Sequence, residues 1–542
     1  MAGDLDVPAA PGQASPQDAE PEPPARRPSL GELAAEARRR VGNGARSVVA
    51  DGRFTMVLLL VALIGNALVL PIPGVVILAA VAVIGAVFSW FNPVTLIAVY
   101  VAACFVIPSR FGIAGLSLTM VLGAAALVLW LLTRALNGPT PGRRAEKVTF
   151  WLWVFAGVKL LGYANAHLHF VRPGQETAVD RQMILVLTMV GIALYVGDVA
   201  RNPRHRRIII DLVVAGAAFM AFTAVLEKWA AVDIASWFDL PFFTDGARAD
   251  GGGALFAPDR LGVERVFGTA TGPLEFAALL SAALPLAAHL AIHGRQRIER
   301  WIGGGAGLLI IVGLPMSVSR TAVVGFFVAG LLTIIGLEPR YRQRALLGFG
   351  VGAAVLLFVF PAVTDATVGL ISDFTGQSGD GIGIEGRTDD YDPVATLIRE
   401  RPVLGRGLGY HDPEAAQLID GERVRAFYLD NQFLTELVNG GVVSFLATIA
   451  LPLTGIRAGR RARALARDPR DAHLAYSVAC ALGVLALTWA FFDAFSFRAS
   501  AGLFFLLLGM AAAMEANVEG RADHESPREP EPEEPRATGA AT

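Results

Sequence analysis

The sequence predicts an all-α fold: a polytopic bundle of about 12–14 transmembrane helices with a large external loop that contains short helices. Hydrophobic residues make up 54% of the 542 residues and charged residues only 17%, and the mean hydropathy is +0.51. Soluble globular domains carry about a quarter charged residues. Apolar runs of about 18–20 residues, the length that a membrane-spanning helix needs, recur along the chain. We therefore expect a multi-pass membrane protein.

Hydropathy gives the positions of the expected helices. Proline and asparagine at 71, 73 and 92–93 separate the first three, because these residues stop helices. The expected spans are, in chain order, 54–70, 74–91, 93–108, 115–136, 148–165, 182–199, 207–228, 272–293, 301–318, 321–337, 345–363, 431–456, 474–493 and 497–516.

Composition divides the chain into five parts. Both ends are rich in proline, alanine and acidic residues and are predicted to be disordered cytoplasmic tails. The expected parts are a tail 1–50, N-terminal transmembrane helices 51–206, a membrane domain 207–456 that includes an external loop 364–430, C-terminal transmembrane helices 457–516 and a tail 517–542.

Arginine and lysine gather in alternate loops, which predicts the orientation in the membrane. Cytoplasmic loops carry an excess of these residues. The basic segments are 38–40, 134–147, 201–207, 295–300, 340–344 and 457–470. We expect a protein of the inner or plasma membrane with both termini cytoplasmic, and with segments 166–181, 229–271 and 364–430 on the outer side.

Two outer segments carry an isolated arginine next to a helix start. Arg265 precedes GTATGP, where Pro273 opens a helix with Glu275 in its first turn. Glu275 fits a plain helix-start acid that complements the helix dipole. A guanidinium beside free backbone N–H groups is also how proteins hold phosphate. Arg320, in the turn SVSRT between two spans, fits either snorkelling to the interface or function, and we favour function.

The region 386–445 is the longest polar insertion. It carries Arg387 and Arg401, and residues 393–400 between them have the spacing of an amphipathic helix, which a glycine-rich turn at 405–409 ends. The run DDYD at 389–392 fits a metal motif only weakly, and we interpret it as a solvated acidic loop.

Asp430 and Asn431 stand where the chain returns to the membrane. Asp430 fits an N-cap, and it equally fits a general base that takes a proton from a hydroxyl. Lys159 and Asp211 are ionisable residues within spans, which are costly there and often functional, but the sequence names no partner for either. No phosphate loop or dinucleotide fingerprint is found, and nothing indicates binding to nucleic acid.

In order along the chain, these segments resemble the bacterial O-antigen ligase and O-antigen polymerase superfamily. The resemblance covers about residues 207–456 and depends on Arg265 with GTATGP, Ser319-Arg320, the segment GRTDDYDPVATLIRERPVLGRGLG at 386–409 and DNQFLTELVNGGVVSF at 430–445. It implies a membrane glycosyltransferase that moves a glycan from undecaprenyl diphosphate to a hydroxyl acceptor on the outer face, without metal or other cofactor.

The resemblance also implies roles for single residues. Arg265, Arg320 and Arg387 would bind the lipid diphosphate, Arg387 and Asp430 would be catalytic, and Asn431, Glu275 and Arg401 would support them. The expected partners are the undecaprenyl-diphosphate-linked glycan, a glycan or other surface acceptor, the lipid bilayer and polysaccharide-assembly proteins.

Asp430 departs from the family pattern, because lipopolysaccharide ligases typically have His-Asn where this chain has Asp-Asn. The difference favours a polysaccharide polymerase or another surface glycan ligase. The main alternative is a multi-span transporter or flippase of lipid-linked oligosaccharide, which would place charges in the membrane midplane and show related halves. A non-catalytic surface assembly protein is a third interpretation.

Overall fold

The computed structural model describes most of the second of two compact units, Met1–Pro71 and Ile72–Thr542. The described residues are 92–108, 111–113, 116–137, 147–169, 176–232, 244–245, 259–260, 263–339, parts of 342–354, 391–410, 417–419, 422–424 and 431–525. The expected spans 54–70 and 74–91, most of 345–363 and most of the two tails lie outside these residues.

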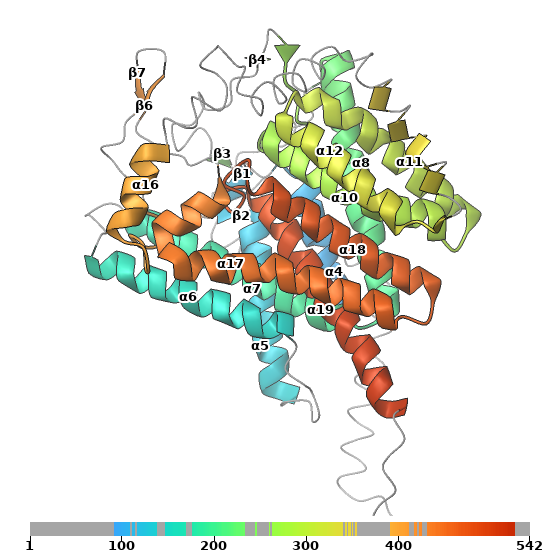
Figure 1. The fold of residues 1–542 in the computed structure, drawn as a ribbon, viewed down its shortest axis with the longest axis horizontal. Coiled ribbons are helices and arrows are strands. Elements are labelled where there is room, and N and C mark those ends of the chain that lie inside the picture. Colours follow the sequence, from blue (N-terminus) through green and yellow to red (C-terminus); the bar gives the residue numbers. More distant parts are fainter. Residues whose placement is uncertain are drawn as a thin grey trace, which may run out of the picture. The chain divides into compact units, whose positions relative to one another are not determined.

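Helices form nearly all of the described structure, so the predicted all-α class is confirmed (Figure 1). Eight helical segments within the described ranges are long and apolar enough to cross a membrane. They lie in α5 (Leu118–Asn137), α7 (Glu176–Val199), α8 (Pro203–Ala230), α10 (Pro273–His293), α11 (Arg297–Gly313) with the short η3 (Leu314–Ser317), α17 (Gln432–Leu465), α18 (Pro469–Thr488) and α19 (Arg498–Glu525).

The remaining elements are shorter or less apolar. They are the helices α4 (Pro93–Phe105), α6 (Lys147–His169), α12 (Arg320–Gly336) and α16 (Tyr391–Glu400), and the strands β1 (Phe111–Ile113), β2 (Leu116–Ser117), β3 (Thr244–Asp245), β4 (Asp259–Arg260), β5 (Val263–Glu264), β6 (Gln417–Ile419) and β7 (Glu422–Val424). The strands form one three-stranded sheet, in the order β2-β1-β3, and two hairpins, β4-β5 and β6-β7. All pairs are antiparallel.

Several helices begin with the same sequence signal. An Asn or Asp directly before a proline caps α4, α8 and α18, through Asn92, Asn202 and Asp468. Each side chain accepts a hydrogen bond from the backbone N–H two residues on. Proline suits the first helical position because its missing N–H would have no intrahelical acceptor there. The predicted starts of these helices are therefore confirmed to within a few residues.

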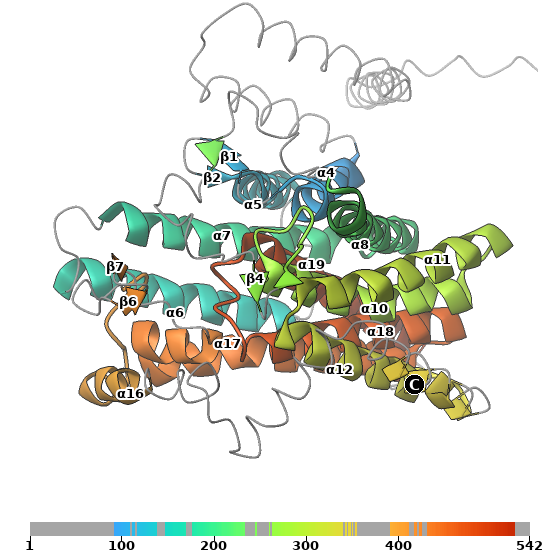
Figure 2. The same ribbon diagram turned by 90° about the horizontal axis from the view of Figure 1, so that it is seen from above.

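Helix α19 lies at the centre of the described bundle. Of its most apolar stretch, 94% is buried, and it packs against α7, α17, α18, α4 and α10. Figure 2 shows α19 between α7 on one side and α17 and α18 on the other. A Cβ on Gly509 would overlap the carbonyl oxygen of Ala193 in α7. The two helices approach so closely because the residue at this contact has no side chain.

The predicted basic segments meet at one end of the bundle, which we call the basic end. The side chain of Arg134 pairs with Asp198 at 3.1 Å, and that of Arg461 with Glu519 at 2.8 Å. A further ion pair joins Arg207 at the start of α8 to Glu299 at the start of α11. Segments that the sequence assigns to the same side of the membrane are thus adjacent in the fold.

The expected span 431–456 is wrong in two respects. The helix continues to Leu465, so most of the basic segment 457–470 is helical. It is also broken at Gly441, where φ is 62° and ψ is −164°. Only glycine adopts this conformation readily. The hydropathy of the segment is continuous across the break and gives no sign of it.

Candidate functional site

Six of the described helices begin at the end of the bundle opposite to the basic end, and α5 and α7 are two of them. Helices α10, α12, α17 and α19 all run toward the basic end, so their N-termini lie at the other end (Figure 1). Helix N-termini carry partial positive charge and unpaired backbone N–H groups. Helices α4, α6, α8, α11 and α18 end there, so any preference for an anionic ligand is local to single helix starts.

Arg265 and Arg320 flank the same tight turn at the opposite end. The Nε of Arg265 donates a hydrogen bond to the carbonyl of Ser317 at 3.1 Å, and Arg320 opens α12 three residues later. Ser319 caps that helix by accepting from the N–H of Thr321 at 3.2 Å. Both arginines are half-buried. Two arginines predicted to bind one diphosphate thus lie at one turn, although they are 55 positions apart in sequence.

Glu275 is a fully buried connection between two of these helix starts. One carboxylate oxygen accepts hydrogen bonds from the N–H groups of Ala499 and Ser500, at 3.0 and 3.2 Å, and the other from Thr271 at 2.9 Å. It therefore binds the start of α19 to the start of α10. The interpretation as a plain helix-start acid is incomplete, because these contacts reach a second helix.

Asn431 caps α17, and the N-cap interpretation of Asp430 is wrong. The Asn431 side-chain oxygen accepts hydrogen bonds from the N–H groups of Phe433 and Leu434, at 2.9 and 3.3 Å. Asp430 and Arg387 both lie outside the described residues. Their predicted roles stay predictions, but the cap fixes where the chain enters the helix directly after Asp430.

The glycine-rich turn, which we call the 402–409 loop, fills the break in α17. On one side of the break, the N–H groups of Arg406 and Gly407 donate to the carbonyls of Val438 and Asn439, at 2.9 and 2.8 Å. On the other side, the N–H groups of residues 442 and 443 donate to the carbonyls of residues 402 and 403, at 2.8 and 3.4 Å. The backbone groups that a broken helix would leave unpaired are therefore satisfied by the loop.

Two glycines allow this approach. Gly405 and Gly407 have φ values of 61° and 105°, and a Cβ on Gly405 would lie 2.6 Å from the backbone of Asn439. A Cβ on Gly407 would lie 2.5 Å from Ala166 in α6. The motif PVLGRGLG is thus explained by backbone conformation and close packing, and its spacing serves the break in α17.

The amphipathic helix expected at 393–400 is confirmed as α16, which lies beside α17 (Figure 1). Val394 is buried while Arg399 and Arg401 are exposed. Arg406 pairs with Glu400, and its guanidinium lies 5.2 Å from the ring centre of Tyr410. Arg401 is thus an exposed cation beside the loop, and its supporting role stays a prediction.

The sequence does not predict one main feature of this region, a buried ion pair. Lys159 in α6 pairs with Glu436 in the short first part of α17, and both side chains are about 95% or more buried. Glu436 also accepts from Ser444 Oγ at 2.5 Å and from Gln432 Nε2 at 2.9 Å. Lys159 was recognisable as a costly intramembrane charge. Its partner was not, because 277 residues separate the two.

Asp211 and a further ionisable residue, His167, each have a partner in the structure. Asp211 is half exposed and lies 4.0 Å from Arg207 near the basic end, so it has a partner and is not a midplane charge. His167 lies 3.3 Å from Asp180, which also accepts from the hydroxyl of Tyr163 at 2.7 Å. These contacts connect the end of α6 to the start of α7.

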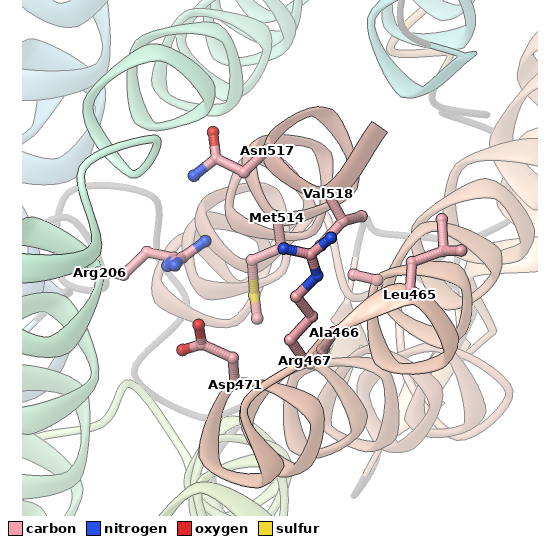
Figure 3. A pocket seen from close by; sticks show the side chains of 10 residues that line it. Arg206, Leu465, Ala466, Arg467, Asp471, Met514, Asn517 and Val518 are labelled. Atoms are coloured by element: carbon pink, nitrogen blue, oxygen red, sulfur yellow. The ribbon is translucent and has the colours of Figure 1, made fainter. Parts of the chain in front are cut away.

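A pocket at the basic end lies far from these residues along the helices. It encloses about 110 Å³ between α8, the α17–α18 connection and α19. Figure 3 shows the guanidinium groups of Arg206 and Arg467 on two sides of it, and Asn517 and Asp471 line it above and below in that view. The pocket therefore does not mark the site that the sequence predicts.

Comparison with known families gives a match to one segment of the chain. The O-antigen ligase family model matches residues 305–449, a segment that includes Arg320, the 402–409 loop and Asn431. Arg265 and Glu275 precede the matched segment. No curated protein matches the chain. The match at residues 305–449 supports an O-antigen ligase- or polymerase-like superfamily for this segment of the chain.

Proposed function

We propose that this protein is a membrane glycosyltransferase of cell-surface polysaccharide assembly. The family match supports an O-antigen ligase-like function in glycan processing at a membrane. We further propose that the donor is a glycan on undecaprenyl diphosphate and that the acceptor is a hydroxyl of a glycan or other surface molecule. The observation that supports it is the turn at 314–320, where Arg265 donates to the carbonyl of Ser317 and Arg320 opens α12 at the end opposite to the basic end.

The proposed reaction is a single inverting displacement. A bond forms between the acceptor oxygen and the sugar C1 carbon, while the bond from C1 to the diphosphate oxygen breaks. Asp430 takes the proton of the acceptor hydroxyl, and the electron pair of the broken bond leaves with undecaprenyl diphosphate. Arg265, Arg320 and Arg387 stabilise the charge that develops on the diphosphate, because fixed cations at a partly dehydrated surface act without reorganising.

The positive-inside rule supports the orientation of this site. The basic end carries the arginine-rich segments and would face the cytoplasm. The opposite end, with the arginine-flanked turn, would face outward in the inner or plasma membrane, with both termini inside. Polysaccharide-assembly proteins are the expected protein partners.

The test is glycan transfer by purified variants in proteoliposomes that contain an undecaprenyl-diphosphate-linked glycan and an acceptor. Arg265→Ala and Arg320→Ala should raise the KM for the lipid donor about ten- to hundredfold, since hydrogen bonds to charged groups contribute about 1.5–3 kcal/mol. Arg387→Ala and Asp430→Ala should abolish transfer with unchanged membrane expression. Arg297→Ala, an exposed arginine at the basic end, is the matched control. Unaltered product with both Arg387→Ala and Asp430→Ala would refute the proposed site.

One observation favours transport as a second candidate. A buried Lys–Glu pair next to a broken helix is a feature of secondary transporters, in which such charges carry ions or substrates. Movement of a fluorescent lipid-linked oligosaccharide across proteoliposomes without acceptor would support this alternative. Transfer without such movement would exclude it.

A further inference from the structure

The pair Lys159–Glu436 belongs to a buried network that connects four parts of the chain. Lys159 lies in α6, Glu436 in the short first part of α17, and Ser444 in the second part, beyond the break. The backbone N–H of Gln432 donates to the carbonyl of Trp489 at 2.9 Å. Its side-chain oxygen accepts from the N–H of Phe495 at 2.7 Å. The turn between α18 and α19 is therefore also part of the network.

The network holds the two parts of α17 at a fixed angle. Glu436 accepts from Lys159 and Ser444 through one oxygen and from Gln432 through the other, so its carboxylate bridges the break. The Lys159 ammonium also lies 5.3 Å from the ring centre of Phe155 and 5.9 Å from that of Phe495. A fully satisfied polar network in a low dielectric fixes one arrangement of its members.

The first part of α17 is short, so its position depends on contacts with neighbouring elements. Residues 432–440 form a helix roughly 13 Å long at about 1.5 Å per residue, which is less than half of the bilayer core. Its carbonyl end is bonded to the 402–409 loop, and its other end carries Asn431 directly after Asp430. Any rotation of this helix would therefore move the residue proposed to activate the acceptor.

We propose that Lys159 and Glu436 are positioning residues that fix the short part of α17, and with it the acceptor side of the reaction site. This inference rests on the proposed function. The pair acts through Asn431 and the 402–409 loop and does not itself contact substrate. Breaking the pair should misplace the acceptor base while leaving the arginine-flanked turn, and so donor binding, intact.

The experiment compares Lys159→Met, Glu436→Gln, the double variant and Ser444→Ala in nanodiscs. Each single change of the ion pair should lower kcat about ten- to hundredfold, the effect of a displacement near 1 Å, with the donor KM changed less than about twofold. The double variant should recover part of kcat, because a single change leaves a buried charge unpaired and the double change does not. Ser444→Ala, which removes only the bond across the break, should have the smallest effect.

Hydrogen exchange separates positioning from a direct chemical role. Amides in peptides covering 402–409 and 432–443 should exchange faster in the single variants and close to the wild-type rate in the double variant. The control is Arg134→Met, which breaks a half-exposed ion pair at the basic end and should change neither readout. Loss of activity with unchanged exchange would overturn the inference, and so would single variants with wild-type kcat. If the wild-type protein transfers no glycan, the proposed function fails, while the exchange data still test the network.

Discussion

Gly441, at the break in α17, gives the most direct test of the structure. Its φ of 62° and ψ of −164° belong to a region that other residues rarely adopt. A Cβ at this position would overlap the carbonyl carbon and oxygen of Val403, so the backbone of the 402–409 loop would have to move away. Gly441→Ala should therefore strain the backbone at the helix break and displace the 402–409 loop.

The expected cost has two parts. The backbone strain of alanine in this conformation is about 1–3 kcal/mol. Displacing the loop removes the hydrogen bonds from the N–H groups of Val442 and Val443 to the carbonyls of Pro402 and Val403, at about 1 kcal/mol each. The sum is about 3–5 kcal/mol, a large fraction of the free energy of unfolding of a typical domain.

The measurement is thermal unfolding in detergent, followed by tryptophan fluorescence. Gly441→Ala should lower the apparent Tm by about 5 °C. Gly304→Ala is the matched control, because Gly304 lies in α11 and a methyl group added there would meet no neighbouring atom within 4 Å. Its Tm should stay equal or rise slightly, since alanine favours helix by up to about 1 kcal/mol. An unchanged Tm for Gly441→Ala would refute the account of the break.

Two further substitutions test the helix starts at the opposite end. Asn431→Ala should destabilise the protein by about 1 kcal/mol, because it removes the cap of α17, while Asn431→Asp should keep the cap and the Tm. Glu275→Gln should lower the Tm in the same detergent assay, because an amide offers one acceptor oxygen where the carboxylate offers two to the starts of α10 and α19. A wild-type Tm for Asn431→Ala would show that the cap contributes nothing, and a wild-type Tm for Glu275→Gln would show that one oxygen suffices.

The positions of several helices were predictable, because they follow from the hydropathy and periodicity of the local sequence. The expected spans 207–228 and 272–293 correspond to α8 and α10 to within a few residues. The helix expected at 393–400 formed as α16, since its apolar residues recur at helical spacing and Pro402 follows. These features depend on local sequence, which carries the period of a helix and the signals that start and stop it.

The break in α17 and the partner of Lys159 could not be predicted in this way. Asn439-Gly440-Gly441 is a turn signal, but glycine is also common within membrane helices, so the sequence alone does not show that the helix breaks there. The break is stable only because the 402–409 loop, some thirty residues earlier, supplies its hydrogen bonds. Glu436 likewise has its partner in another helix. Both are tertiary effects between distant segments, which local patterns do not encode.

The candidate site was predictable in part. The structure brings Arg265 and Arg320 to one turn and identifies Asn431 as the cap of α17, while their predicted roles in binding and catalysis stay predictions. It also gives Glu275 a different and more extensive set of contacts than a helix-start acid would have. Arg387 and Asp430 lie outside the described residues, so their roles are tested by the proposed substitutions.

The broken helix has a consequence for how the chain enters the membrane. During synthesis, the apolar part of residues 432–465 would be recognised as one membrane segment, because a single candidate span covers both sides of Gly441. In the proposed orientation, the loop that completes the break emerges earlier, on the opposite side of the bilayer from the basic end. The final shape of α17 therefore requires the loop to dock after the helix has inserted. Epitope tags or cleavage sites inserted within 402–409 should therefore stop folding after the helix has inserted and before the loop has docked.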